Sequence, residues 1–246
     1  KAQNDVLFLN HAIVNPPVDR NRPVDEVEDV FVHAIKETDA GIYIRGAKVV
    51  ATGSALTQAN FCASNRGVLR KREYALAFFA PMTTPGVKLI CRHSYELQAA
   101  ATGSPFDYPL SGRMDVNDAI LVFDNAFIPW ENVFLYGDVE KSDGLMQGSR
   151  TNGRVCMQAF TRLAVKPEFI IGLTLKAARI AGTNTIRTTQ VLIGELIMLR
   201  NTVRALLDAM EAHPENLPNG FLTFNETYAL TLRAIGPHVY TRMRDI

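Results

Sequence analysis

The segment GIYIRGAKVV, from Gly41 to Val50, is rich in β-branched and aromatic residues and predicts β-structure with a turn at Arg45-Gly46. Similar signals follow it along the chain. They are Tyr74–Ala80, closed by Pro81; Val87–Cys91, after a Pro85-Gly86 turn; Ala119–Asp124; and Val133–Tyr136. Short strands at this spacing are typical of a β-sandwich or barrel.

After about residue 150 the pattern becomes helical. One helix is expected from Val155 to about Ala181, with Pro167 kinking it or splitting it in two. Gly182 suits the C-terminal cap of this helix. The sequence therefore predicts a second structural region built from helices.

A long second helix is indicated by an apolar stripe with alternating steps of four and three residues. The stripe consists of Leu192, Leu196, Leu199, Val203, Leu206 and Met210. This helix should end at His213-Pro214, because proline disfavours helix in the residue before it. A third helix should begin near Asn225-Glu226. We predict a β domain over residues 1–148 and the start of a helical domain over residues 149–246.

Composition excludes several classes of protein. The chain has 246 residues, of which 47% are hydrophobic, so it can bury a full core. The net charge of +1 gives no basic excess for a nucleic-acid partner. No apolar run approaches the roughly 20 residues of a membrane span, so we expect no membrane partner.

The three cysteines, Cys62, Cys91 and Cys156, are far apart, which argues against a disulfide scaffold or a CxxC zinc site. We therefore expect a reducing, cytoplasmic location. The five histidines lack HExxH spacing, and no metal site is expected. The chain also lacks GxGxxG, Walker and GxSxG motifs.

Two segments carry candidate site residues, each with two interpretations. His11 lies in FLNHAIVNPPVDR, where the two prolines either turn a strand end or hold the imidazole rigidly beside a pocket. Thr52 and Gly53 lie in KVVATGSALT, which is either a polar turn or a place where the backbone approaches a flat ligand. The segment Ser104–Arg113 could be a structural loop or line an aromatic substrate pocket.

Four long segments together resemble one family. LFLNHAIVNPPVDR, KETDAGIYIRGAKVVATGSALT, SYELQAAATGSPFDYPLSGRMDVNDAILVFDNAFIPWENVFLYGD and RLAVKPEFIIGL are similar to the oxygenase component of the 4-hydroxyphenylacetate 3-monooxygenases. The resemblance implies an α+β, acyl-CoA dehydrogenase-like fold. Its middle antiparallel β-barrel or sandwich would precede the first helices of a C-terminal bundle, in a fragment without the N-terminal helical domain.

The resemblance also implies an activity. In this family a separate NAD(P)H-dependent flavin reductase supplies reduced FAD, which reacts with O2 to form a C4a-hydroperoxyflavin. A phenol, free or tethered to a carrier protein, is then hydroxylated at the ortho carbon to a catechol. The family usually forms homotetramers. A phenol held by hydrogen-bond donors in an enclosed apolar pocket suits this chemistry, and the flavin supplies the oxygen chemistry.

Residue roles follow from the same resemblance. His11 matches a catalytic histidine that contacts both the flavin region and the substrate hydroxyl, and Thr52 matches a threonine near flavin N5. The other matched FAD contacts are Ala12, Ile13, Pro17, Val18, Asp19 and Arg20. Ser64 and Asn65 fall where a substrate loop lies, within Gln58–Arg72.

Alternatives stay open at this point. A relative of 4-hydroxybutyryl-CoA dehydratase would join FAD to an iron–sulfur cluster, although the isolated cysteines argue against it. A non-catalytic, truncated domain is a further possibility. The basic residues Arg66, Arg70, Lys71 and Arg72 either suit an anionic or carrier-bound substrate or form a solvated loop. We expect the chain alone to bind FAD weakly and not to hydroxylate.

Overall fold

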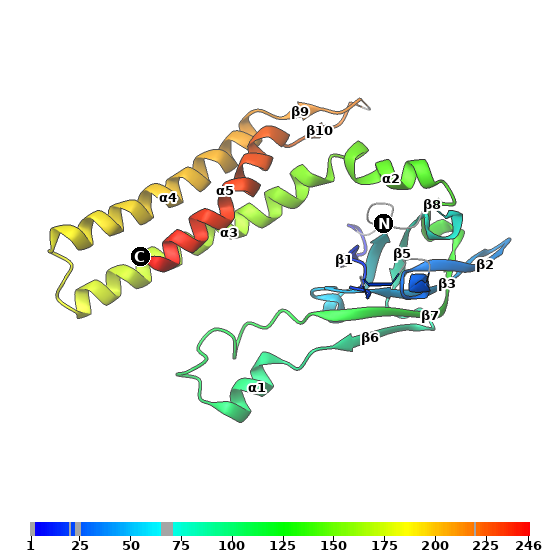
Figure 1. Cartoon of the computed structure of the whole chain (residues 1–246), viewed down its shortest axis with the longest axis horizontal. Coiled ribbons are helices and arrows are strands. Elements are labelled where there is room, and N and C mark those ends of the chain that lie inside the picture. Colours follow the sequence, from blue (N-terminus) through cyan, green and yellow to red (C-terminus); the bar gives the residue numbers. More distant parts are fainter. Residues whose placement is uncertain (1–2, 20, 23–25, 65–70, 219) are drawn as a thin grey trace. The chain divides into compact units, whose positions relative to one another are not determined.

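The computed structural model describes residues 3–19, 21–22, 26–64, 71–218 and 220–246. The chain divides into two compact units, Lys1–Leu145 and Met146–Ile246, which are treated separately below. The first unit is mainly β and the second mainly helical (Figure 1). The sequence-based boundary after residue 148 lies slightly further along and stays a prediction.

The first unit contains two four-stranded sheets. The strands are β1 (Leu9–Ala12), β2 (His33–Thr38), β3 (Gly41–Lys48), β4 (Ala59–Ala63), β5 (Leu76–Pro81), β6 (Val87–Cys91), β7 (Ala119–Pro129) and β8 (Val133–Tyr136). One sheet has the order β1-β4-β5-β8 and the other β2-β3-β7-β6. Short 3-10 helices lie at Glu28–Val30, Ser54–Leu56, Arg72–Tyr74 and Trp130–Asn132.

The pairing is antiparallel except between β1 and β4, which run parallel. The predicted sandwich-type β domain is therefore confirmed, with one parallel pair that an all-antiparallel prediction omits. The consequence matters for the site. In a parallel pair both carboxyl ends lie at the same edge, so the residues after Ala12 and after Ala63 leave the sheet together.

The core of this unit lies between the two sheets. Ile42 and Ile44 of β3, Phe78 of β5 and Phe123 of β7 are almost completely buried there. The rings of Phe78 and Phe123 meet edge to face at 5.6 Å, which joins the two sheets directly. Alternate residues along each strand supply this core, as expected for a two-layer packing.

The turn predicted at Arg45-Gly46 is wrong, because β3 runs without a break from Gly41 to Lys48. The irregularity lies opposite, where β7 has two residues facing Arg45. Glycine is required at position 46 for a reason other than a turn. Its φ is +112°, and a Cβ there would lie 2.2 Å from the carbonyl oxygen of Phe31. The glycine allows close backbone approach within a strand.

Two helices were absent from the sequence-based prediction. α1 (Tyr95–Thr102) begins at Ser94, whose hydroxyl accepts hydrogen bonds from the backbone N–H groups of Glu96 and Leu97. α2 (Val139–Gly148) follows β8. Both are short, and neither carries the long apolar stripe that marks a helix in sequence.

The second unit begins with α3 (Thr151–Ile180), which passes through Pro167 as one helix. Of the two predicted effects of Pro167, the split is therefore wrong, and the kink stays a prediction. The C-terminal end of α3 is as predicted. Gly182 has a φ of +68°, its N–H bonds to the carbonyl of Arg179, and the N–H of Thr183 bonds to that of Ala178. This pattern is a Schellman motif, which favours glycine at that position.

The rest of the unit comprises α4 (Arg187–Ala212), the hairpin β9 (Glu215–Asn216) and β10 (Leu222–Thr223), and α5 (Glu226–Asp245). The C-terminal end of α4 at Ala212 and the start of α5 at Glu226 confirm the predictions. The stripe on α4 is turned slightly from the predicted one: Ile193 and Leu207 are buried with Leu196, Val203 and Met210, whereas Leu192 is exposed. Within the part of the chain that the structure describes, no helix has the length and apolar character required to span a bilayer.

Candidate functional site

The carboxyl end of β1 carries His11 and Ala12 on opposite sides of the sheet. Ala12 is 1% exposed and belongs to the core. His11 is exposed on the outer side, and its ring has no hydrogen-bond partner among the described residues. Because Ala12 faces inward, only its backbone is accessible to a ligand at this edge.

An aromatic surface adjoins His11 on the outer side of the sheet. Phe61 of β4 is the register partner of His11 and lies near Phe79 of β5 and Phe134 of β8. The ring centroids of Phe61 and Phe79 are 5.6 Å apart, and those of Phe79 and Phe134 are 5.3 Å apart. Phe134 remains 60% exposed. An exposed imidazole therefore adjoins an apolar surface suited to a flat ring.

The Thr52 turn lies next to β1, although about forty residues separate them in sequence. The Asn10 side-chain amide donates to the carbonyl oxygen of Thr52. The Thr52 hydroxyl is exposed and donates to the carboxylate of Asp118. Gly53, at a φ of +77°, has open space beside it: a Cβ there would meet only the Asn10 side-chain nitrogen within 4 Å, at 3.8 Å.

The segment after β1 was predicted to hold FAD. Ile13 and Val18 are half-buried and Pro17 is exposed. The carboxylate of Asp19 accepts a hydrogen bond from the backbone N–H of Asn21 at 2.9 Å, so it stabilises a local turn. Arg20 lies outside the described residues, and these roles stay predictions.

The predicted substrate segment is only partly a loop. Residues 59–63 of it form β4, and Ser64 follows directly. The Ser64 hydroxyl donates to the carbonyl oxygen of Tyr74 and accepts a hydrogen bond from the backbone N–H of Leu76 at 3.4 Å. Asn65 lies outside the described residues.

Two of the four basic residues of this segment have acidic neighbours. Lys71 Nζ lies 2.5 Å from a Glu28 carboxylate oxygen, and Arg72 lies 3.3 Å from one of Glu37. These ion pairs favour a structural explanation for both side chains. Arg66 and Arg70 lie outside the described residues.

Lys48, the last residue of β3, is a site-proximal residue that sequence reasoning missed. It is 3% exposed, and its ammonium group reaches from one sheet to the other. Nζ donates to the Asn15 side-chain oxygen at 2.7 Å, to the Ala63 carbonyl at 2.9 Å and to the Ile13 carbonyl at 3.4 Å. All three acceptors are uncharged.

Burial shifts the pKa values of Lys48 and of its neighbour Cys62 in opposite directions. Desolvation lowers the pKa of Lys48 from 10.5 to about 8, an effect opposed by the nearby Cys62. Desolvation raises the pKa of the Cys62 thiol to about 12. Near neutral pH Lys48 is therefore mostly charged and Cys62 is a neutral thiol.

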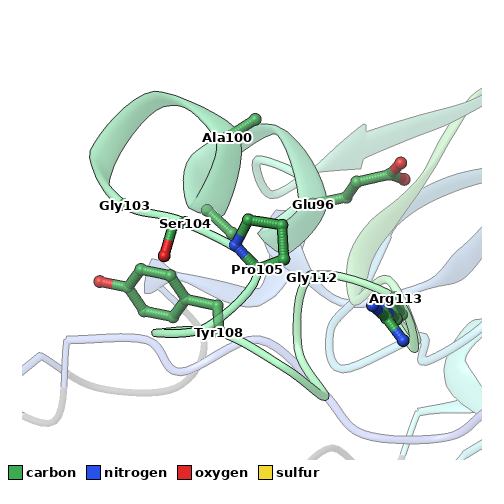
Figure 2. A pocket seen from close by; sticks show the side chains of 9 residues that line it. Glu96, Ala100, Gly103, Ser104, Pro105, Tyr108, Gly112 and Arg113 are labelled. Atoms are coloured by element: carbon green, nitrogen blue, oxygen red, sulfur yellow. The ribbon is translucent and has the colours of Figure 1, made fainter.

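The segment Ser104–Arg113 forms a pocket with α1, separate from the features above. A cavity of about 310 Å³ is lined by Glu96, Ala99, Ala100, Gly103, Ser104, Pro105, Tyr108, Gly112 and Arg113. Figure 2 shows the Tyr108 ring beneath Pro105, with Glu96 and Arg113 further along the cavity. The ring packs closely against Gly103, where a Cβ would lie 2.6 Å from it. This contact favours the structural interpretation of the segment.

Among the described residues, no three His, Cys, Asp or Glu side chains gather as a metal site would require. Cys62 is buried in the β unit, Cys91 is exposed, and Cys156 is buried in the helical unit. The three cysteines therefore do not form a metal-binding cluster with one another.

Comparison with solved structures defines the class of fold. A probable acyl-CoA dehydrogenase of Mycobacterium abscessus aligns over 84% of this chain and 49% of its own, with a TM-score of 0.58 at 12% identity. A 4-hydroxybutyryl-CoA dehydratase from N. maritimus aligns over 99% of this chain and 49% of its own, with a TM-score of 0.84 at 20% identity. At such identities these likenesses show the fold alone, and they confirm the predicted acyl-CoA dehydrogenase-like architecture.

The chain belongs to the 4-hydroxyphenylacetate 3-hydroxylase family. The N-terminal family model matches residues 1–135 and the C-terminal model residues 142–246. A crystal structure of the oxygenase component of 4-hydroxyphenylacetate 3-monooxygenase, complexed with FAD and 4-hydroxyphenylacetate, has a TM-score of 0.87 at 29% identity. It aligns with 98% of this chain and 50% of its own.

Curated relatives are closer in sequence. The oxygenase component of 4-nitrophenol 2-monooxygenase from Rhodococcus sp is 49% identical over the whole chain. A Streptomyces globisporus monooxygenase, named for a (3S)-3-amino-3-(3-chloro-4-hydroxyphenyl)propanoyl group on a peptidyl-carrier protein, is 47% identical. The chain spans 47% of the length of each, so it corresponds to about half of these relatives.

Proposed function

We propose that this chain contributes the flavin-binding wall of the oxygenase component of a two-component phenol monooxygenase. The observation that carries the proposal is the junction between β1 and the Thr52 turn, where the Asn10 side chain fixes the turn against the strand that bears His11. The related FAD complex with 4-hydroxyphenylacetate supports the cofactor and the class of substrate. FAD, when bound in reduced form, supplies the redox chemistry that activates O2.

The residues at this junction fit a planar cofactor. Because Gly53 has no side chain, the space beside its backbone is open to a ligand. On the side of β1 that bears His11, an apolar surface is formed by Phe61, Phe79 and Phe134. Apolar walls of this kind exclude water from a reaction site. Ile13, Pro17, Val18, Asp19 and Arg20 complete the proposed FAD contacts, together with the backbone of Ala12.

His11 has the properties that a phenol-orienting group needs. Its imidazole is exposed and has no hydrogen-bond partner among the described residues, so it can donate to a phenolic oxygen. A hydrogen bond to that oxygen would fix which ring carbon faces the oxygen-transfer position. We assign His11 to the catalytic role and to substrate contact, with Ser64 and Asn65 as further substrate contacts.

Thr52 has its hydroxyl direction set by a charged neighbour. Its proton is committed to Asp118, so the lone pairs of the oxygen are left to accept a hydrogen bond. A reduced flavin carries an N–H at N5, whereas an oxidised flavin does not. The arrangement therefore favours the reduced form of the cofactor over the oxidised form.

We also propose partners and a substrate for the full-length protein. A flavin reductase supplies its reduced FAD, it assembles as a homotetramer, and its substrate is a phenol that is either free or tethered to a carrier protein. Both kinds of substrate occur in the names of close relatives. A cytoplasmic location is part of the same proposal.

Oxygen consumption by the full-length protein tests the function. The protein is mixed with a generic flavin reductase, NADH, FAD and a panel of nitro-, chloro- and carboxymethyl-phenols. We expect a catechol from at least one of them. No catechol from any phenol, with reduced FAD and O2 present, would refute the proposal, and iron in the purified protein would favour a dehydratase-like enzyme instead.

A further inference from the structure

We propose that Lys48 is a positioning residue for the FAD site, because its ammonium group joins the ends of the two strands that carry the predicted cofactor and substrate residues. This inference rests on the proposed function. Lys48 does not contact the ligand in this proposal. It acts through the backbone and through Asn15, which it holds.

The geometry supports this role. β1 and β4 are parallel neighbours, so their carboxyl ends lie side by side with no turn between them. Lys48 comes from the opposite sheet and donates to Ile13 and Asn15 beyond β1 and to Ala63 at the end of β4. A single side chain thus ties together the two segments that enter the site, the one after β1 and the end of β4.

The backbone beside Lys48 strengthens the junction. The N–H of Val49 donates to the carbonyl of Val14 at 2.9 Å, so the chain after β3 pairs with the chain after β1. Thr52 follows this bridge by three residues. Movement of the Ile13–Asn15 segment would therefore displace both His11 and the Thr52 turn.

The three bonds require the protonated amine. An ammonium group has three N–H donors and a neutral amine has two, so deprotonation leaves one of the three acceptors without its donor. The remaining bonds would also lose their charge assistance. Cys62 of β4 is the titratable neighbour that acts on this group, and its thiol stays neutral, whereas β7 brings the apolar register partner Leu121. The segment 13–15 brings no titratable group.

The sharpest test measures the affinity of the full-length protein for reduced FAD at pH 7 and pH 9 by anaerobic equilibrium titration. If only the charged form of Lys48 holds the site, the protonated fraction falls about ten-fold over this range, and the Kd rises by about the same factor. Lys48→Met has no charged form, so at pH 7 it should bind at least ten-fold more weakly than the wild type and show no step between pH 7 and pH 9. Lys48→Arg keeps the charge and should bind without a pH step.

Lys88→Met is the matched control. Lys88 is an exposed lysine of β6 in an ion pair with Asp124, and its removal should leave the wild-type pH profile intact. A wild-type Kd that is equal at pH 7 and pH 9 would overturn the inference, as would tight, wild-type binding by Lys48→Met. If the wild type binds no reduced FAD at either pH, the proposed function fails and this inference with it.

Discussion

The buried charge of Lys48 predicts an unusual dependence of stability on pH. The perturbation is Lys48→Met, which keeps an unbranched apolar stem and removes the titrating group. Lys48 has a pKa of about 8 in the folded protein, against 10.5 for a solvated lysine, because burial disfavours its charge. Below pH 8 the group is charged in both states, and the fold bears the full desolvation penalty.

The sign follows from proton binding. Between about pH 8 and pH 10.5 the unfolded chain holds a proton that the folded chain has lost, so stability rises with pH. One proton is worth 1.36 kcal/mol per pH unit, and the transition is only half complete at pH 8. From pH 7 to pH 9 the free energy of unfolding of the wild type should therefore rise by about 1 kcal/mol relative to Lys48→Met.

Urea denaturation of both proteins at pH 7, 8 and 9 measures this difference. Cys62 titrates in the opposite direction, because its raised pKa makes the fold lose stability above about pH 9, but it is present in both proteins and cancels. The two stability curves should diverge with rising pH, the wild type gaining. Parallel curves, or a wild type that loses stability relative to the variant, would refute the assignment of a buried, charged Lys48.

Three further predictions test the site and the fold. In the full-length protein, His11→Ala should keep consuming O2 while H2O2 replaces most of the catechol, whereas His93→Ala should remain coupled; equal coupling in both variants would remove His11 from its role. Asp118→Ala removes the acceptor of the Thr52 proton, so the ratio of catechol to O2 should fall about ten-fold, and an unchanged ratio would contradict the assigned hydroxyl direction. Gly46→Ala should lower the free energy of unfolding by about 2 kcal/mol or more, because its Cβ would meet the Phe31 carbonyl at 2.2 Å. Gly194→Ala, in open space on α4, should instead raise it by about 0.5–1 kcal/mol in the same urea experiment.

Sequence patterns predicted those helices and strands in which apolar residues recur at a regular spacing over a long stretch. The helix α4 is an example, since its apolar stripe and His213-Pro214 gave both its face and its end. The short helix α1 was missed because eight residues hold only two turns, and its clearest signal is the single cap Ser94. The β1–β4 pairing was also missed, because nothing local records which strands are neighbours.

The same contrast holds within the candidate site. His11 and Thr52 were found through a family resemblance, and their spacing in sequence says nothing of the Asn10 hydrogen bond that joins them. Lys48, in contrast, had a local signal. Ile42 and Ile44 face the core, and simple alternation along β3 carries Lys48 to the same buried side. The turn wrongly predicted at Arg45-Gly46 interrupted that alternation and concealed it.

Lys48 also connects stability with function through opposite dependences on pH. Loss of its proton relieves the desolvation penalty, so the fold becomes more stable as pH rises through 8. Deprotonation also removes one of the three hydrogen bonds that Lys48 donates to the segments after β1 and at the end of β4. The proposed FAD site is then less rigidly positioned, and its affinity for FAD falls. An apolar residue at this position would avoid the penalty altogether but could not bind three carbonyl-type oxygens. A buried lysine without an acidic partner is therefore better explained by the segments that it positions than by any gain in stability. This explanation requires that FAD affinity falls with rising pH while the free energy of unfolding rises.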